Sequence, residues 1–120
     1  MHELSIATAI VEQAGEFARR DGADAVTAVT VRVGELAGVV PDALRFAFEV
    51  ARDGTALAGA RLEIEHVPAR GYCDGCAEEF AVGMPPLFWC PRCDRPCAEL
   101  RSGRELEITG VEPAPAAAPP

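Results

Sequence analysis

Two hydrophobic periods follow one another along the first part of the chain. Between residues 3 and 20 the apolar positions recur every three or four residues, as on the buried face of an α-helix; they are Leu4, Ala7, Ile10, Val11, Ala14, Phe17 and Ala18. Gly22 follows at a position where it can end such a helix. Residues 26–34 instead show alternation, with three valines on one side: Val29, Val31 and Val33. The pattern therefore predicts a helix followed by a strand.

The pattern predicts one further helix and two further strands. Pro41 and Asp42 are favoured in the first turn of a helix, and Gly54 stands where that helix would close. Its apolar face is formed by Leu44, Ala47, Phe48 and Ala51. Residues 60–67 and 104–111 alternate apolar with polar side chains, which predicts a strand in each.

The segment between these two strands contains all five cysteines. We therefore expect residues 68–101 to form a small lobe that is inserted into one α/β domain, which comprises residues 1–67 and 102–112. A lobe of about 35 residues is too small to be stabilised by its apolar core alone and needs a cross-link such as a disulfide or a bound metal ion. Residues 113–120 consist only of proline and alanine, a composition that predicts a disordered tail.

Four of the cysteines form two Cys-x-x-Cys pairs that are separated by thirteen residues. Two such turns supply four thiolates, which match the closed tetrahedral shell of a structural zinc ion. A four-thiolate site also suits iron, and a single Cys-x-x-Cys pair can act as a redox dithiol. The redox interpretation is disfavoured because two pairs are present and neither begins a helix after a strand. We therefore predict that zinc is bound by Cys73, Cys76, Cys90 and Cys93.

Three further predictions concern residues around these pairs. The lobe is expected to have a small apolar cluster made of Tyr72, Phe80, Leu87, Phe88 and Trp89. Cys97, the fifth cysteine, is interpreted as a free thiol that packs as a small hydrophobic side chain. His66 falls on the strand face of Leu62 and Ile64, which predicts a core histidine rather than a metal ligand.

The charge of the chain disfavours nucleic acid as a partner. The net charge is -8, and all eleven basic residues are arginine. Residues 68–104 contain five arginines and five acids, so the cysteine-bearing segment is not a basic patch. The first thirteen residues have neither a basic region nor an unbroken apolar run, which predicts neither a signal peptide nor a membrane span. An odd number of cysteines, four of them in metal-type pairs, favours a reducing, cytoplasmic location.

The chain opens Met1-His2-Glu3, and this opening is a second candidate metal site. The terminal amine, the backbone nitrogen of His2 and its imidazole can close fused chelate rings, and the Glu3 backbone nitrogen could complete a plane. Deprotonated backbone amides in a square-planar field suit Ni(II) or Cu(II) rather than zinc. Taken alone the signal is weak, because a histidine near a chain end is usually a solvated side chain.

Several motifs taken together resemble the HypA/HybF family of nickel metallochaperones that act in [NiFe] hydrogenase maturation. They are Met-His-Glu-Leu-Ser at 1–5, Val-Gly-Glu-Leu at 33–36, Phe-Ala-Phe-Glu at 46–49, the two Cys-x-x-Cys pairs and Gly-Arg-Glu-Leu at 103–106. The likeness covers residues 1 to about 112 in order. One departure is Asp94, which stands where a glycine more commonly follows the second pair.

The resemblance implies an α+β protein in which a small mixed sheet of about three strands lies with two helices, together with a zinc-ribbon-like lobe. It also implies nickel bound at Met1, His2 and Glu3, structural zinc on the four paired cysteines, and two partners. These partners are a maturation GTPase and the hydrogenase large-subunit precursor; some relatives serve urease. Whether the chain forms a homodimer is left open.

We therefore expect a nickel carrier without a catalytic step of its own. The chain has no phosphate-binding loop of the Gly-x4-Gly-Lys kind and no lysine, so any GTP hydrolysis would come from a partner. The main alternative is a zinc ribbon that docks other proteins, with His2 incidental. A metal-dependent enzyme is disfavoured because one histidine on a chain terminus cannot preorganise a reaction site.

Overall fold

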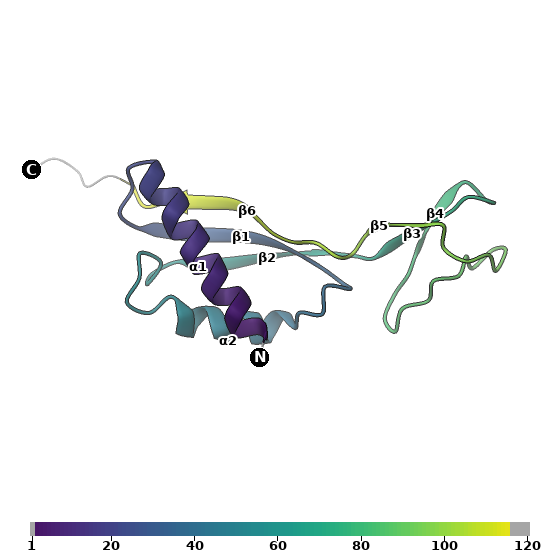
Figure 1. The fold of residues 1–120 in the computed structure, drawn as a ribbon, viewed down its shortest axis with the longest axis horizontal. Coiled ribbons are helices and arrows are strands. Elements are labelled where there is room, and N and C mark those ends of the chain that lie inside the picture. The colour runs from purple at the N-terminus through teal and green to yellow at the C-terminus, as the bar shows by residue number, and fades with distance from the viewer. Residues whose placement is uncertain (1, 116–120) are drawn as a thin grey trace, which may run out of the picture. The chain divides into compact units, whose positions relative to one another are not determined.

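The computed structural model describes residues 2–115, which form two helices and six strands (Figure 1). In chain order these are α1 (His2–Arg20), β1 (Val26–Gly34), α2 (Pro41–Ala51), β2 (Arg61–Val67), β3 (Arg70–Cys73), β4 (Glu78–Ala81), β5 (Glu99–Ser102) and β6 (Leu106–Pro113). The predicted helices and long strands are confirmed in type and approximate position. Neither α1 nor α2 is long and apolar enough to cross a membrane.

The chain divides into two compact units. The first, here called the helical unit, comprises Met1–Val31, Val39–Glu65 and Glu107–Pro120. The second, the cysteine unit, comprises Arg32–Gly38 and His66–Leu106. Whether residues 68–101 fold as an inserted lobe stays a prediction.

Helix α1 buries a stripe of small and branched side chains against the rest of the helical unit. The buried residues are Ala7, Ile10, Val11, Ala14, Gly15 and Ala18. Two residues of the predicted stripe are not buried, since Leu4 is 41% and Phe17 52% exposed. Phe17 lies at the margin of the stripe, whereas Leu4 lies in the first turn of the helix, before the first buried residue, Ala7. The sequence period predicted the buried face correctly but made it too wide at Phe17 and too long at Leu4.

The first sheet has the strand order β2-β1-β6, and β1 is its central strand. Val29, Val31 and Val33 of β1 are at most 1% exposed, as their alternation predicted. Hydrogen bonds near the ends of β1 indicate that β6 runs antiparallel and β2 parallel to it: Gly34 N to Glu105 O (2.7 Å), Ala114 N to Ala25 O (2.9 Å), Val26 N to Ala56 O (3.0 Å) and Glu35 N to Val67 O (2.8 Å). The small mixed sheet of three strands with two helices is thereby confirmed.

The prediction for His66 is wrong, because this side chain is exposed and Val67 is buried in its place. Leu62 and Ile64 are half-buried on alternate positions of β2, but the alternation stops after Ile64. A strand keeps its two-residue period only while the same face remains covered.

Strand β6 extends further than the sequence pattern indicated. It includes Pro113, the first residue of the predicted disordered tail, and Ala114 still donates its N–H to the Ala25 carbonyl. Residues 116–120 of that tail lie outside the described part of the chain.

Candidate metal centre

The two Cys-x-x-Cys pairs bring four sulfur atoms together in the cysteine unit. Cys73 ends strand β3 and Cys76 lies in the turn after it, whereas Cys90 and Cys93 come from the loop before β5. All four sulfurs lie within 4.8 Å of one another. The Sγ atoms of Cys73 and Cys93 are 3.5 Å apart, and those of Cys76 and Cys90 are 3.9 Å apart. The structure therefore brings the four predicted residues into one group.

This arrangement fits a tetrahedral thiolate site. Zinc–sulfur bonds of about 2.3 Å in a tetrahedron place the sulfurs about 3.8 Å apart, close to both distances above. Cys73 and Cys90 are buried, Cys76 is half-buried and Cys93 is exposed. None of the five cysteines is in a disulfide. The group can hold one metal ion with a closed shell of sulfur ligands.

Matching turns follow the second cysteine of each pair. Ala77 after Cys76 and Asp94 after Cys93 both have positive φ, 54° and 61°. In the first turn the N–H of Cys76 points at the Cys73 sulfur, at 3.4 Å. Asp94 thus adopts the left-handed conformation, which glycine adopts most readily and which aspartate visits more often than most other residues. Ala77 carries no comparable signal in the sequence, because alanine has no preference for this conformation.

Replacing Ala77 with glycine is expected to stabilise the cysteine unit by about 1 kcal/mol, since only glycine adopts positive φ without steric cost. The measurement is the midpoint of denaturant unfolding of the zinc-loaded protein. Ala81→Gly, in the exposed end of β4, is the matched control and should destabilise instead. Equal destabilisation by both changes would contradict the strain at Ala77.

Without metal the thiols of Cys76 and Cys90 do not ionise alike. The backbone amide of Arg92, with smaller help from that of Cys93, lowers the pKa of the Cys90 thiol from 9.0 to about 7. Hydrogen bonding with Cys93, followed by burial, raises the pKa of Cys76 to about 12. Cys90 therefore forms a thiolate more readily than Cys76, and a metal must displace the proton of Cys76. Metal binding should consequently weaken as the pH falls.

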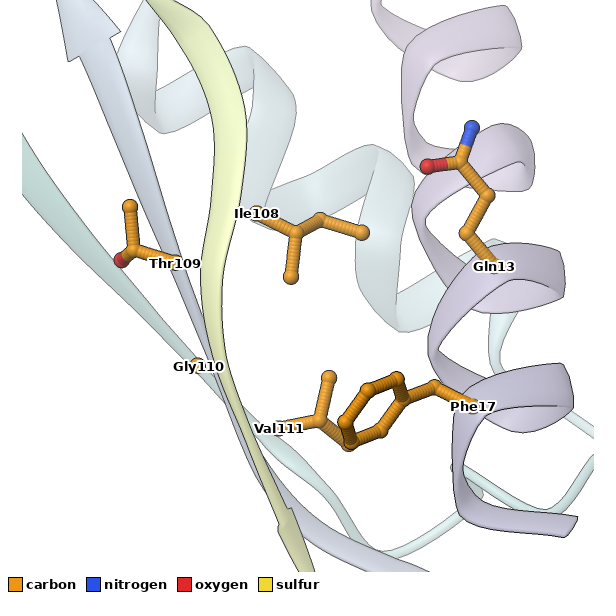
Figure 2. A pocket seen from close by; sticks show the side chains of 6 residues that line it. All are labelled: Gln13, Phe17, Ile108, Thr109, Gly110 and Val111. Carbon is orange, nitrogen blue, oxygen red and sulfur yellow. The ribbon is translucent and has the colours of Figure 1, made fainter. Parts of the chain in front are cut away.

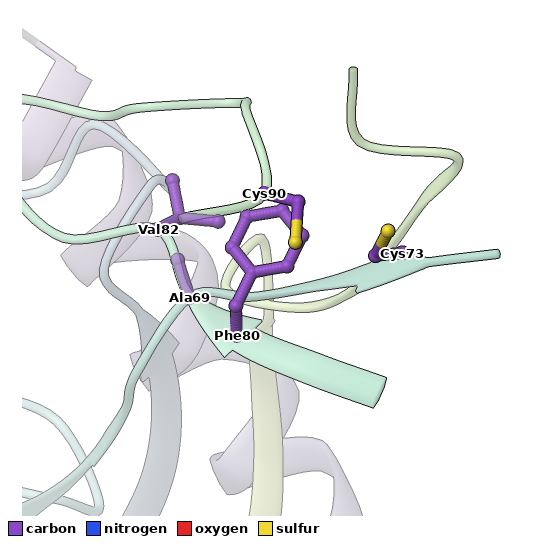
Figure 3. Packing of buried hydrophobic residues seen from close by; sticks show 5 residues of the cluster. All are labelled: Ala69, Cys73, Phe80, Val82 and Cys90. Atoms are coloured by element: carbon purple, nitrogen blue, oxygen red, sulfur yellow. The ribbon is translucent and has the colours of Figure 1, made fainter. Parts of the chain in front are cut away.

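A very small core surrounds the sulfurs. Its buried members are Ala69, Cys73, Phe80, Val82 and Cys90 (Figure 3). Of the predicted apolar cluster only Phe80 is among these buried residues. Leu87, Phe88 and Trp89 are 64%, 40% and 57% exposed, and Tyr72 is half-buried beneath Arg101. Leu87, Phe88 and Trp89 precede Cys90 in a loop. Because the Cys90 sulfur points toward the other cysteines, these three side chains lie outside the small core.

The second sheet has the strand order β4-β3-β5, and β3 runs antiparallel to both of its neighbours. Cys73 of β3 and Phe80 of β4 belong to this core. Cys97 packs half-buried against the core, and its Sγ donates to the Glu99 carbonyl at 3.0 Å. It is not one of the four clustered sulfurs. The interpretation of Cys97 as a small hydrophobic side chain agrees with this placement.

The second candidate site lies at the start of α1. His2 is its first residue, and the His2 Nε2 atom lies 3.0 Å from the Glu3 carboxylate. The first four N–H groups of an α-helix lie outside its own hydrogen-bond ladder, so a metal held by backbone nitrogens there would leave that ladder intact. Met1, the third predicted contributor, lies outside the described residues.

Comparison with known proteins gives one consistent result. The family model described as "Hydrogenase/urease nickel incorporation, metallochaperone, hypA" matches residues 1–113. The chain is 54% identical over 112 residues to the hydrogenase maturation factor HypA of Chloroflexus aurantiacus, covering 93% of this chain and 98% of the relative. It is 51% identical over 112 residues to the HypA of Streptomyces avermitilis, covering 92% and 86% respectively.

Solved structures show the same fold at lower sequence identity. The solution structure of the Ni metallochaperone HypA from Helicobacter pylori superposes with a TM-score of 0.65 at 21% identity, covering 92% of this chain and 96% of that one. A second HypA solution structure gives 0.69 at 23% identity, with coverage of 95% and 97%. The full-length family match and the close relatives lead to one conclusion: this chain belongs to the HypA family of metallochaperones for nickel incorporation into hydrogenase and urease.

Proposed function

We propose that this chain binds Ni(II) at its N-terminus and delivers the ion during [NiFe] hydrogenase maturation, with urease as the other recipient that the family description allows. The observation that carries the proposal is the family match from residue 1 to 113, which includes the Met1-His2-Glu3 opening. The terminal amine, the His2 imidazole and the backbone nitrogens of His2 and Glu3 are the proposed ligands.

The zinc assignment is part of the same proposal. Cys73, Cys76, Cys90 and Cys93 would hold a structural zinc ion, supported by the spacing of their sulfurs. Zinc held by these four residues would tie the two pairs together and serve as a structural ion. A reducing, cytoplasmic location fits these free thiols, because they must stay reduced to bind the metal.

Transfer would proceed by ligand exchange rather than catalysis. A planar site of four nitrogens leaves both axial faces of the nickel ion open, so an incoming thiolate can attack before the ion is released. The proposed partners are a maturation GTPase, which supplies the nucleotide chemistry absent from this chain, and the hydrogenase large-subunit precursor, which receives the metal.

A nickel titration tests this proposal directly. Zinc-loaded, tag-free protein with a native Met1 is expected to take up one equivalent of nickel and to give the absorption spectrum of a planar, diamagnetic complex. His2→Ala and a chain extended by one residue at the N-terminus should both lose this uptake, because each removes a ligand from the fused chelate rings. Equal, weak binding by all three proteins would favour the alternative, a zinc-ribbon docking module without a nickel role.

A further inference from the structure

A free sheet edge borders an apolar hollow in the helical unit. Strand β6 ends the order β2-β1-β6, and within residues 2–115 no strand pairs with its other side. Such an edge presents main-chain N–H and C=O groups that can pair with another extended segment. Proteins commonly cover or blunt an edge of this kind.

Beside this edge, α1 and β6 enclose a hollow of about 260 Å³. It is lined by Gln13 and Phe17 of α1 and by residues 108–111 of β6. Figure 2 shows Phe17, Ile108 and Val111 pointing toward one another, whereas Thr109 points away from them. The volume is below the roughly 300–1,000 Å³ of small-molecule sites, so the hollow suits an inserted side chain better than a cofactor. Phe17, which is 52% exposed, gives it an uncovered aromatic wall.

Charge disfavours a second copy of the chain as the occupant. Strand β6 carries Glu107 and Glu112 and no basic residue. Glu112 lies 4.0 Å from Arg61, and Glu107 also interacts within the chain. Antiparallel pairing of two β6 strands that placed Ile108 opposite Val111 would also place Glu107 opposite Glu112. Like charges directly opposite are destabilising, and each copy has a net charge of -8. A segment with basic residues would meet attraction at the same places.

We propose that the β6 edge and this hollow dock an extended, basic segment of a partner protein. Main-chain hydrogen bonds to β6 would align the segment, and one apolar side chain would enter the hollow and set its register. Lysine or arginine neighbours would face the β6 carboxylates. Phe17 lies fifteen residues along α1 from His2, which is about 22 Å of helix, so docking would leave the proposed nickel site accessible.

The test uses the zinc-loaded full chain and a defined probe. The probe is a capped hexapeptide that alternates lysine and valine, and its control has glutamate in place of each lysine. Amide NMR spectra should show saturable shifts at residues 106–113 and around Phe17 with the lysine peptide only. Phe17→Ala should weaken binding roughly tenfold, because it removes most of the apolar wall. Phe46→Ala, at an exposed phenylalanine of α2, should leave the affinity unchanged.

Three outcomes would overturn the proposal. They are no shift with either peptide, unsaturable shifts spread over the acidic surface, and equal loss of affinity in the Phe17 and Phe46 variants. Because Phe17 is remote from His2, nickel uptake by Phe17→Ala should match that of the unchanged protein. The docking surface and the nickel proposal can therefore fail separately.

Discussion

Replacing Cys73 with serine is expected to abolish zinc binding and unfold the cysteine unit. Two of the five buried residues of its core are themselves proposed ligands, which leaves Ala69, Phe80 and Val82. Burial of a phenylalanine or a valine contributes only about 1.5–3 kcal/mol each, whereas structural zinc contributes about 10–16 kcal/mol in small metal-folded domains. Without the metal, the apolar burial cannot offset the entropy of ordering these strands. Bound zinc per chain and amide NMR spectra measure the two effects.

The matched control is Cys97→Ser. The serine hydroxyl can still donate to the Glu99 carbonyl, and this cysteine lies outside the four-sulfur group, so one zinc per chain should remain. Trp89, the only tryptophan and the neighbour of Cys90, gives a fluorescence readout of metal loss. Full NMR dispersion of the cysteine unit after metal removal from the unchanged chain would contradict a structural role for zinc.

Replacing Gly34 with alanine is expected to cost about 3 kcal/mol of folding stability, at the upper end of the usual range for overpacking. An added Cβ at this position would lie 2.2 Å from the carbonyl carbon and oxygen of Gly103, and 2.6 Å from the nitrogen of Arg104. These are main-chain atoms, so no side chain can rotate away to make room. Strand β1 must shift, and with it the hydrogen bonds that Gly34 and Leu36 donate to Glu105 and Gly103.

Gly15→Ala serves as the control for a glycine-to-alanine change in general. Its Cβ would meet only side-chain atoms, at 3.6 and 3.7 Å, and alanine is favoured over glycine inside a helix by about 1 kcal/mol. The free energy of unfolding, measured with denaturant, should therefore fall for Gly34→Ala and rise for Gly15→Ala. A Gly34→Ala protein as stable as the unchanged chain would show that the approach of Gly34 to Gly103 is not rigid.

The four clustered cysteines could be found from sequence because each Cys-x-x-Cys turn is a local structure. Two cysteines separated by two residues face the same point in a tight turn, whatever surrounds them. Their partner pair lies only thirteen residues further on. The same holds for α1, α2 and β1, whose periods are set within a few residues of one another. The terminal nickel site remains a prediction, since Met1 lies outside the described residues.

Burial within the cysteine unit could not be predicted in the same way. Leu87, Phe88 and Trp89 have the composition of a core but lie in a loop whose path is set by Cys90 and Cys93. The burial of His66 was predicted wrongly because the alternation of β2 stops after Ile64, whereas the strand continues to Val67. In both cases the hydrophobicity of a side chain indicates whether its burial would be favourable. Whether the side chain is buried depends on which neighbouring residues pack against it.

By itself the sequence determined the two helices, the three strands of the mixed sheet, the four clustered cysteines and the family. Only the tertiary structure decided that residues 32–38 belong to the cysteine unit, that Gly34 meets Gly103, and that an apolar hollow opens between α1 and β6. The physical reason is the range of the interactions. Periodicity and turn geometry act over a few residues, whereas these contacts join positions about 30 to 90 residues apart. The approach of such positions depends on the packing of everything between them.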